Sequence, residues 1–286
     1  MKTGTAIQFL FGGCLSLCFS GCSTEVYTIQ DFESLNSVHV GNGITFHPNK
    51  KQLLISKPTE QLASNGKPYY RIFQCNQNSG NWSCNHEVSF SSKFTDYHPV
   101  FSPDGKWVYF NSDRPVPGQK IPAGKINIWR VSFTNDQWGE PEYLKDINTE
   151  YHESYPSIAG NGTLYFNSDR PDGKGSMDIY KSEFINGRFT KPVPIVALNS
   201  ADSENDLVID PQERFIIFNR YHFDTKEVDL YISQNQNGAW SKPSPLNSIN
   251  KEGTWELTPT LAPGSDYFLF EINGKIKYVE LKELIK

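Results

Sequence analysis

The sequence lacks the motifs that mark several common enzyme classes. After residue 21 it has no Gly-x-Ser-x-Gly elbow, no Gly-rich phosphate loop and no dinucleotide-binding fingerprint. The elbow presents a nucleophilic serine and Gly-rich loops bind phosphate groups, so those chemistries are not expected here. No α/β domain follows the last repeat described below, which argues against a peptidase built like prolyl oligopeptidase.

Clusters of basic residues are also absent. The 286 residues include 27 Lys and Arg against 32 Asp and Glu, giving a net charge of −5. Proteins that bind nucleic acid concentrate Lys and Arg on one surface. Nucleic acid is therefore not an expected partner.

Long apolar runs are missing except near the N-terminus. Lys2 precedes the apolar stretch 6–19, which is too short to span a bilayer and is typical of a signal peptide. Phe19-Ser20-Gly21-Cys22 resembles the lipobox of bacterial lipoproteins, with Phe19 where Leu is usual. We expect residues 1–21 to be a lipoprotein signal peptide and Cys22 to carry the lipid anchor. An ordinary secretory signal cleaved near Gly21 is the alternative.

Cysteine is scarce, with five in the chain. Cys14 and Cys18 leave with the signal and Cys22 takes lipid, which leaves Cys75 and Cys84. These two flank a turn-rich segment, so their thiols can face each other across a hairpin. We predict a disulfide, which would stabilise the fold by roughly 2–3 kcal/mol, whereas two unpaired thiols are the alternative.

A repeat of 51 to 57 residues runs through the rest of the chain. Each copy has a polar turn between two short apolar strands, and a repeat this long built from strands is typical of a radial β array. The five turns are centred on Pro48, Pro103, Gly160, Pro211 and Pro263.

Each copy predicts four strands. The second strands are continuous apolar triplets such as 108–110 and 164–166, which indicates burial on both faces. The fourth strands carry a proline at Pro141, Pro192 and Pro243, and proline is tolerated on an outer edge.

The last copy ends before a fourth strand, while residues 27–38 precede the first copy. The segment 32–35 is similar to a fourth strand, so we expect it to complete the last blade and close the ring. The sequence thus predicts one five-bladed propeller of four-stranded antiparallel blades, with a six-bladed ring as the alternative. Three segments are expected, namely the signal peptide at 1–21, the anchored segment and closing strand at 22–38, and the propeller at 39–286.

The repeat resembles that of the TolB family of β-propellers. The match is strongest over 96–114, through Asp96, Pro99, the run 102–106, Phe110 and Arg114. It continues over 153–180 and covers about 245 residues. The resemblance implies a propeller in the bacterial envelope. TolB itself resembles a six-bladed ring of shorter repeats behind a separate N-terminal domain, so its partners are not carried over.

Charged residues are expected to gather on one face of the ring. The loops that lead into the first strands and those that join the second strands to the third open on the same face of a propeller. We interpret the repeated acid and Arg as ion pairs between blades, or else as a surface that binds a partner. The carboxylates are Asp96, Glu153, Glu204 and Glu256, and the residues of the other loops are Asp113, Arg114, Asp169, Arg170 and Arg220.

The histidines do not follow the repeat. His98, His152 and His222 each follow a tyrosine in a loop of this face. No cofactor is expected, but three imidazoles with carboxylates nearby could hold a divalent cation. The four ring carboxylates could alternatively act as acid and base on a glycan.

These observations favour a binding protein over an enzyme. We expect a monomeric scaffold, anchored by lipid in the outer membrane and facing the periplasm, that binds an envelope protein or a glycan. The alternative is an extracytoplasmic glycoside hydrolase or lyase with its carboxylates, and a metal if one is bound, at the propeller channel.

Overall fold

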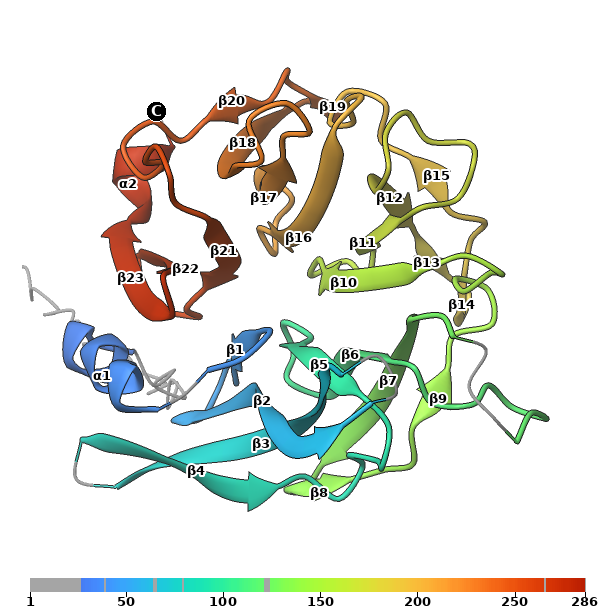
Figure 1. Cartoon of the computed structure of the whole chain (residues 1–286), viewed down its shortest axis with the longest axis vertical. Helices are drawn as coiled ribbons and strands as arrows, with labels where there is room; N and C mark the ends of the chain where they lie inside the picture. Colours follow the sequence, from blue (N-terminus) through green and yellow to red (C-terminus); the bar gives the residue numbers. More distant parts are fainter. Residues whose placement is uncertain are drawn as a thin grey trace, which may run out of the picture.

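The computed structural model describes residues 27–38, 40–63, 66–78, 80–120, 124–264 and 266–285. Five antiparallel sheets stand around a central axis as the blades of a propeller (Figure 1). The expected five-bladed ring is confirmed, and the six-bladed alternative is wrong. The predicted signal peptide and Cys22 lie outside the described residues.

The first two blades contain four and five strands. Blade 1 comprises β1 (Ile44–Phe46), β2 (Gln52–Leu62), β3 (Pro68–Asn78) and β4 (Asn81–Glu87). Blade 2 comprises β5 (Asp96–Phe101), β6 (Trp107–Ser112), β7 (Asn127–Thr134), β8 (Gln137–Trp138) and β9 (Glu142–Tyr143). Both β8 and β9 pair with β7, so the outer strand is split at Pro141, which has no N–H to donate.

The next two blades repeat this plan. Blade 3 comprises β10 (Glu153–Ile158), β11 (Leu164–Ser168), β12 (Asp178–Ser182) and β15 (Val193–Pro194), with β13 (Phe184–Ile185) and β14 (Arg188–Phe189) as a separate hairpin. Blade 4 comprises β16 (Ser203–Ile209), β17 (Phe215–Tyr221), β18 (Val228–Gln236), β19 (Ala239–Trp240) and β20 (Ser244–Pro245).

Blade 5 has three strands, β21 (Glu256–Leu261), β22 (Tyr267–Ile272) and β23 (Lys275–Glu280), followed by α2 (Leu281–Leu284). Apolar clusters fill the spaces between blades, and Phe110, Phe166 and Phe218 of the second strands are fully buried within them. The second strands are buried on both faces because each sheet lies between two others. The predicted disulfide between Cys75 and Cys84 is present between β3 and β4.

The predicted closing strand is wrong, because residues 27–38 form α1 (Ile29–Ser34) and the 3₁₀ turn η1 (Leu35–Ser37). Thr28 and Asp31 make a capping box, in which the Thr28 N–H donates to the Asp31 carboxylate at 2.7 Å. That reciprocal pairing satisfies the first backbone groups of a helix and favours it over an extended strand.

The same segment nevertheless closes the ring. The Asn36 side chain accepts from the Ile276 N–H at 2.9 Å and donates to the Ile276 carbonyl at 3.2 Å. Its amide thus pairs with β23 as the next strand would. Three other amides hold the third strands of blades 2, 3 and 4 in the same way, and we call the four residues the clasp: Asn36, Asn148, Asn199 and Asn250.

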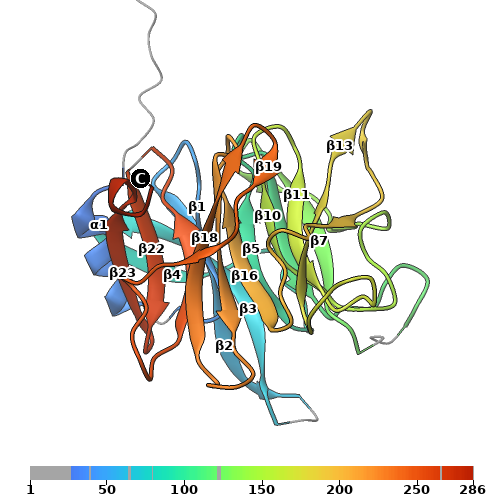
Figure 2. The same cartoon turned by 90° about the horizontal axis from the view of Figure 1, so that it is seen from above.

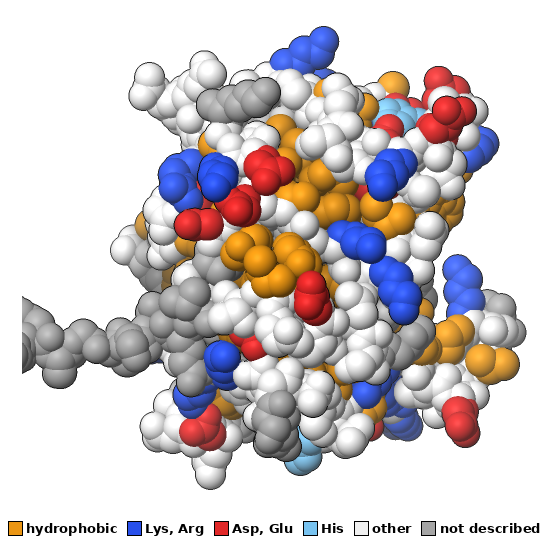
Figure 3. Space-filling model, turned by 90° about the vertical axis from the view of Figure 1, so that its left-hand side faces the viewer, with side chains coloured by type: hydrophobic (Ala, Val, Ile, Leu, Met, Phe, Trp, Pro, Cys, Tyr) orange, Lys and Arg blue, Asp and Glu red, His pale blue; other side chains and the backbone are white. Residues whose placement is uncertain are grey.

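Helix α1 lies beside β23 at the junction of the first and last blades (Figure 1). Phe32 packs on Tyr267 and Tyr278 of blade 5, with ring centroids 5.6 and 5.8 Å away, and the Trp82 indole of blade 1 donates to the Asp31 carbonyl at 2.9 Å. On this side of the molecule, charged side chains of both signs are scattered around an apolar area (Figure 3). Among the described residues, no helix has the length and apolar character that crossing a membrane requires.

Candidate functional site

The two ends of the ring differ in their loops, as the side view shows (Figure 2). We call the end with the turns between first and second strands the turn face. The other end, which carries the loops into the first strands and from the second to the third strands, is the loop face.

Three of the predicted carboxylates on the loop face form buried ion pairs with arginine. The Asp96–Arg114, Glu153–Arg170 and Glu204–Arg220 pairs have N–O distances of 2.7, 2.8 and 2.7 Å, and all three carboxylates are fully buried. Each pair lies within one blade, so the expectation of pairs between blades is wrong. The arginines also donate to the carbonyls of Phe90, Ile147 and Leu198, in the segments that arrive from the preceding blades.

The other predicted residues of this ring also contact their own loops. Asp113 accepts from the Thr95 N–H at 2.8 Å and Asp169 from the His152 N–H at 2.7 Å. Glu256 is buried with no salt bridge among the described residues, and burial raises the pKa of its carboxyl. The Thr254 hydroxyl donates to one Glu256 oxygen, while the other has no hydrogen-bond partner in the described parts of the chain.

The three predicted histidines do not form a common site. His152 Nδ1 accepts from the Ile126 N–H at 3.1 Å, while His222 lies 3.0 Å from Asp202 and 3.4 Å from Asp229. His98 Nδ1 is 3.5 Å from Oδ1 of Asp206. Across the part of the chain that the structure describes, no three His, Cys, Asp or Glu side chains are grouped to hold a metal ion.

A different set of five residues occupies equivalent positions of the five blades, and the four that are not glycine line the channel. In blades 2 to 5 the pairing of the first and second strands shifts there, as at a β-bulge. All five have positive φ, between 35° and 108°, although only one of them is a glycine. We call this set the belt: Gly43, His98, Tyr155, Asp206 and Thr258.

The bulge turns backbone N–H groups of the belt toward the preceding blade. His98 donates to the Asn42 carbonyl at 2.9 Å, and Thr258 donates to Oδ2 of Asp206 at 2.7 Å. The Tyr155 N–H reaches Asn111 Oδ1 at 3.1 Å. A left-handed conformation costs of order 1–3 kcal/mol at a non-glycine residue, and such strain gathers at functional sites.

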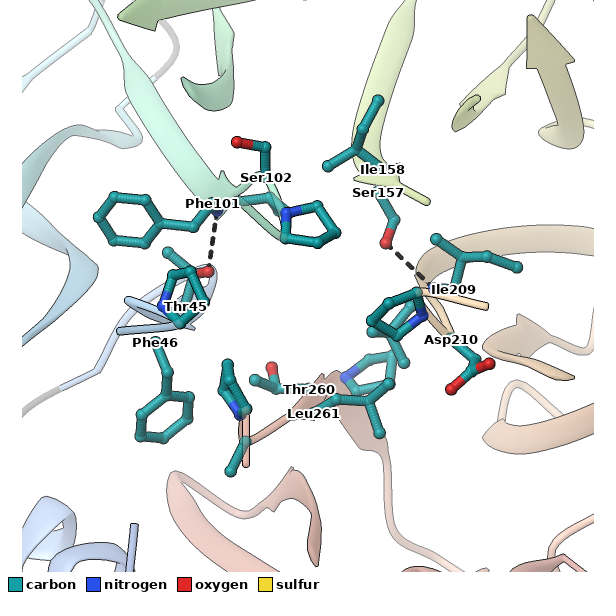
Figure 4. Close-up of a pocket in the computed structure, with 18 of the residues that line it drawn as sticks. Thr45, Phe46, Phe101, Ser102, Ser157, Ile158, Ile209, Asp210, Thr260 and Leu261 are labelled. Atoms are coloured by element: carbon teal, nitrogen blue, oxygen red, sulfur yellow. Dashed lines mark hydrogen bonds between the residues drawn. The ribbon is translucent and has the colours of Figure 1, made fainter. Parts of the chain in front are cut away.

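The belt lies between two cavities of the channel. The loop-face cavity measures about 460 Å³ and the turn-face cavity about 430 Å³, and His98 lines both. In the turn-face cavity the Thr45 and Ser157 hydroxyls accept from the N–H groups of Phe101 and Ile209, each at 3.0 Å (Figure 4). Those hydroxyls have partners, so the turn-face cavity offers fewer unpaired groups to a ligand.

The loop-face cavity contains polar atoms without partners. Among the described residues, His98 Nδ1, Asp206 Oδ1 and Thr258 Oγ1 have no hydrogen-bond partner, and each residue is only 5% exposed. Burial, with a further contribution from Glu271, raises the pKa of Asp206 to about 7. Burial lowers the pKa of His98 to about 3. Both side chains are therefore neutral in mildly acidic solution.

Aromatic rings form much of the cavity wall. Tyr70, Tyr155, Tyr221 and Trp255 line it, and Trp255 is 52% exposed at the rim. The Tyr221 and Trp255 ring centroids lie 6.3 Å apart. A cavity with large apolar walls and a few convergent polar groups is typical of ligand sites.

Sequence reasoning named only His98 from the belt. Tyr155, Asp206 and Thr258 each stand one position before the first-strand Pro or Leu, in the same place as His98. In an alignment of the repeats, this position differs in residue type from one copy to the next, while positions near it keep a similar type. The positive φ at this column has only a weak signal in the residue types. Gly, His and Asp adopt positive φ more often than other residues, but Tyr and Thr rarely do.

Comparisons with known proteins support the fold. No protein-family model and no curated protein matches the sequence. The putative TolB of Agrobacterium tumefaciens is similar in structure, with a TM-score of 0.52 and 16% identity over 80% of this chain and 68% of that one. The Hadza microbial sialidase Hz136 has a TM-score of 0.52 and 10% identity over 84% of this chain and 65% of its own. The TolB-like propeller fold is thus confirmed, and at such identities the likeness extends to the fold alone.

Proposed function

We propose that this protein is a binding scaffold of the bacterial cell envelope that holds a protein or glycan partner at the loop-face cavity. The supporting observation is the belt, where one repeated backbone bend carries glycine in blade 1 and four different side chains in the other blades. A purely structural ring would need no such variation, nor buried polar atoms without partners.

An anchor at Cys22 would orient the loop face toward a partner. The Tyr27 hydroxyl lies 3.1 and 3.0 Å from the carbonyls of His47 and Gln52, which flank the β1–β2 turn on the turn face. Tyr27 and Cys22 are five positions apart in the sequence, a span of at most about 18 Å. A lipid on Cys22 would therefore hold the turn face near the membrane and leave the loop face open to the periplasm. Cys22→Ala should then move the protein from the membrane fraction to the soluble fraction.

Site-specific photo-cross-linking in the native cell tests the binding role. A benzophenone amino acid at Tyr221, in the wall of the loop-face cavity, should give a discrete adduct with one partner. The same group at Val193, on the outer strand β15, is the matched control and should give none. Equal labelling from both positions, or no adduct from Tyr221, would contradict the proposal.

An enzyme acting on extracytoplasmic polysaccharide is the second candidate. Its supporting observation is the Asp206 carboxyl, whose pKa of about 7 suits an acid catalyst, together with Glu271 in the same cavity. Asp96, Glu153 and Glu204 are occupied by arginines and suit that role less. Polysaccharide turnover that is lost in Asp206→Asn would favour this candidate, and its absence across a hydrolase and lyase screen would favour the scaffold.

A further inference from the structure

Three acceptor atoms without partners among the described residues belong to residues that line the loop-face cavity, and they come from three blades. Asp206 Oδ1 of blade 4 and His98 Nδ1 of blade 2 lie 3.5 Å apart across the channel. The Thr258 N–H of blade 5 donates to Oδ2 of the same carboxylate at 2.7 Å, and its hydroxyl has no partner within the described ranges. With the imidazole proton on Nε2, all three atoms can accept a hydrogen bond.

The cavity has acidic side chains but no permanently charged basic ones. Asp206 and Glu271 line it, and its lining contains neither Lys nor Arg. Lys226 lies outside the lining, with its ammonium 6.0 Å from the Tyr221 ring centroid. A buried carboxylate without a counter-ion is costly and attracts a cation, so an anionic ligand is disfavoured.

The shape of the cavity restricts the size of the cation. The acceptor atoms lie at the belt, where side chains of opposite blades approach within 3.5 Å, so only a small head group can reach them. Above the belt, the rings of Tyr155, Tyr221 and Trp255 line the path to solvent. Aromatic faces pack against hydrocarbon and attract a cation that passes over them.

We infer that the loop-face cavity binds a primary ammonium group on an alkyl stem, of the kind that ends a lysine side chain of a polypeptide partner. An ammonium has three N–H donors, which match the three acceptors. The charge-assisted bond to Asp206 supplies most of the preference for the cation. This inference rests on the proposed binding function and names the group that the cavity recognises.

Calorimetric titration with small probes tests the inference on the intact folded protein. Nα-acetyl-lysine methylamide should bind at pH 7.5 at least about tenfold more tightly than its Nε-acetylated form, which keeps the stem and loses the charge. Glucosamine is the third probe and should bind more weakly than the lysine derivative. Equal affinity for the first two probes would contradict recognition of the ammonium charge. Tighter binding of glucosamine would contradict the preference for an alkyl stem.

Two variants connect the selectivity to the acceptors. Asp206→Asn keeps an oxygen for the Thr258 N–H and should reduce the preference for the charged probe to less than about threefold. Thr258→Val removes one acceptor and should lower the affinity for the charged probe by roughly threefold. Asp104→Asn, on an exposed turn-face carboxylate, is the control and should change neither value. Melting temperatures confirm that each variant is folded, and unchanged selectivity in folded Asp206→Asn would overturn the assignment.

The protons exchanged on binding provide an independent readout. At pH 6 the Asp206 carboxyl carries a proton that an arriving ammonium must displace, so about one proton should be released per ligand. His98, Tyr155 and Glu271 face or neighbour this carboxyl, so release must vanish in Asp206→Asn to be assigned to it. No release from the wild type would contradict the assignment. Cross-linking from Tyr221 would still succeed in that case, so failure of the inference is distinguishable from failure of the binding role.

Discussion

The residues of the loop-face ion pairs recur from blade to blade, whereas the residues of the belt change in type. Asp96, Glu153 and Glu204 recur with their arginines, and each recurrence gives the same buried pair. His98 and Asp206 occupy one recurring backbone position with unlike chemistry. Repetition therefore identifies the residues that hold the blades, and departures from it identify those available to a ligand.

The buried Asp206 carboxyl predicts a pH-dependent effect of Asp206→Asn. Its pKa is raised from 3.8 to about 7, so its contribution to stability is present below about pH 4 and is lost as the pH rises through 7. The substitution removes that loss and should raise the free energy of unfolding by a few kcal/mol at pH 8, but much less at pH 4.5. Urea denaturation at both pH values measures the difference. A gain of the same size at both would show that ionisation is not its cause.

The Asp206→Asn variant should also reveal that His98 changes the free energy of unfolding with pH in the opposite direction. The pKa of His98 is lowered to about 3, so its contribution is present above about pH 6.5 and is lost as the pH falls toward 3. Between pH 4 and 6.5 the two effects oppose each other in the wild type. In Asp206→Asn the stability should therefore rise more steeply with pH over this range.

Removing Arg170 should destabilise the ring. Arg170 is 9% exposed and Glu153 is fully buried, so Arg170→Ala leaves a buried charge without its partner. Loss of one member of such a pair costs about 3–5 kcal/mol. Arg130→Ala removes a pair whose acid, Glu142, is 48% exposed, and should cost less than about 1 kcal/mol. Similar melting temperatures for the two variants would contradict the structural role and return Arg170 to the candidate binding residues.

The sequence predicts part of the site at this scale. The carboxylates and arginines could be placed on one face because their spacing follows the repeat. The pairing within a blade could not, since Asp96 and Arg114 are brought together by the register of β5 and β6. The position of Asp206 in the channel could not be predicted either, because it depends on a bulge that the residue types do not indicate.

Among the structural elements, α1 and η1 occupy the place of the missing strand at the edge of blade 5. The segment resembles a strand in sequence because Leu35-Asn36-Ser37 is similar to Leu198-Asn199-Ser200, which ends the outer edge of blade 3. The two segments share the hydrogen bonds of their clasp asparagines, but their backbone conformations differ. The capping box between Thr28 and Asp31 was visible in the sequence and indicates the helix that the structure contains.

Substitution of the clasp tests this equivalence. Asn36→Ala removes two hydrogen bonds to the Ile276 backbone and should lower the free energy of unfolding by about 1–3 kcal/mol. Asn199→Ala removes the same pair of bonds from Ile179 and should have a similar effect. Ser37→Ala, next to the clasp and exposed, is the control. A negligible effect for Asn36→Ala beside a large one for Asn199→Ala would show that the N-terminal segment is not part of the closure.

The molecule as a whole is a ring whose two ends meet between blades 5 and 1. Thr260 of blade 5 donates to the Ile44 carbonyl of blade 1 at 3.3 Å on the inner side, and α1 contacts both blades on the outer side. The five-bladed architecture followed from the repeat. The helical form of its closure did not, because nothing in the repeat specifies how a terminal segment packs.

Deletion of residues 27–38 should open the ring at one place. Hydrogen exchange of backbone amides should accelerate in β1 and β23, which lose the cover of α1, while β11 in blade 3 keeps its protection. Mass spectrometry of the exchanged protein measures this directly. Uniform acceleration in all five blades would instead indicate that the propeller unfolds as one cooperative unit.

The contact between Asn36 and Ile276 joins residues 240 positions apart. At a synthesis rate of about 5–20 residues per second, the Asn36 amide waits on the order of ten seconds or more for its partner. During that time the apolar face of α1, with Phe32 and Leu35, has no surface from blade 5 to cover it. Formation of the closing contact comes late and costs the loop-closure entropy of nearly the whole chain, so folding should be slow.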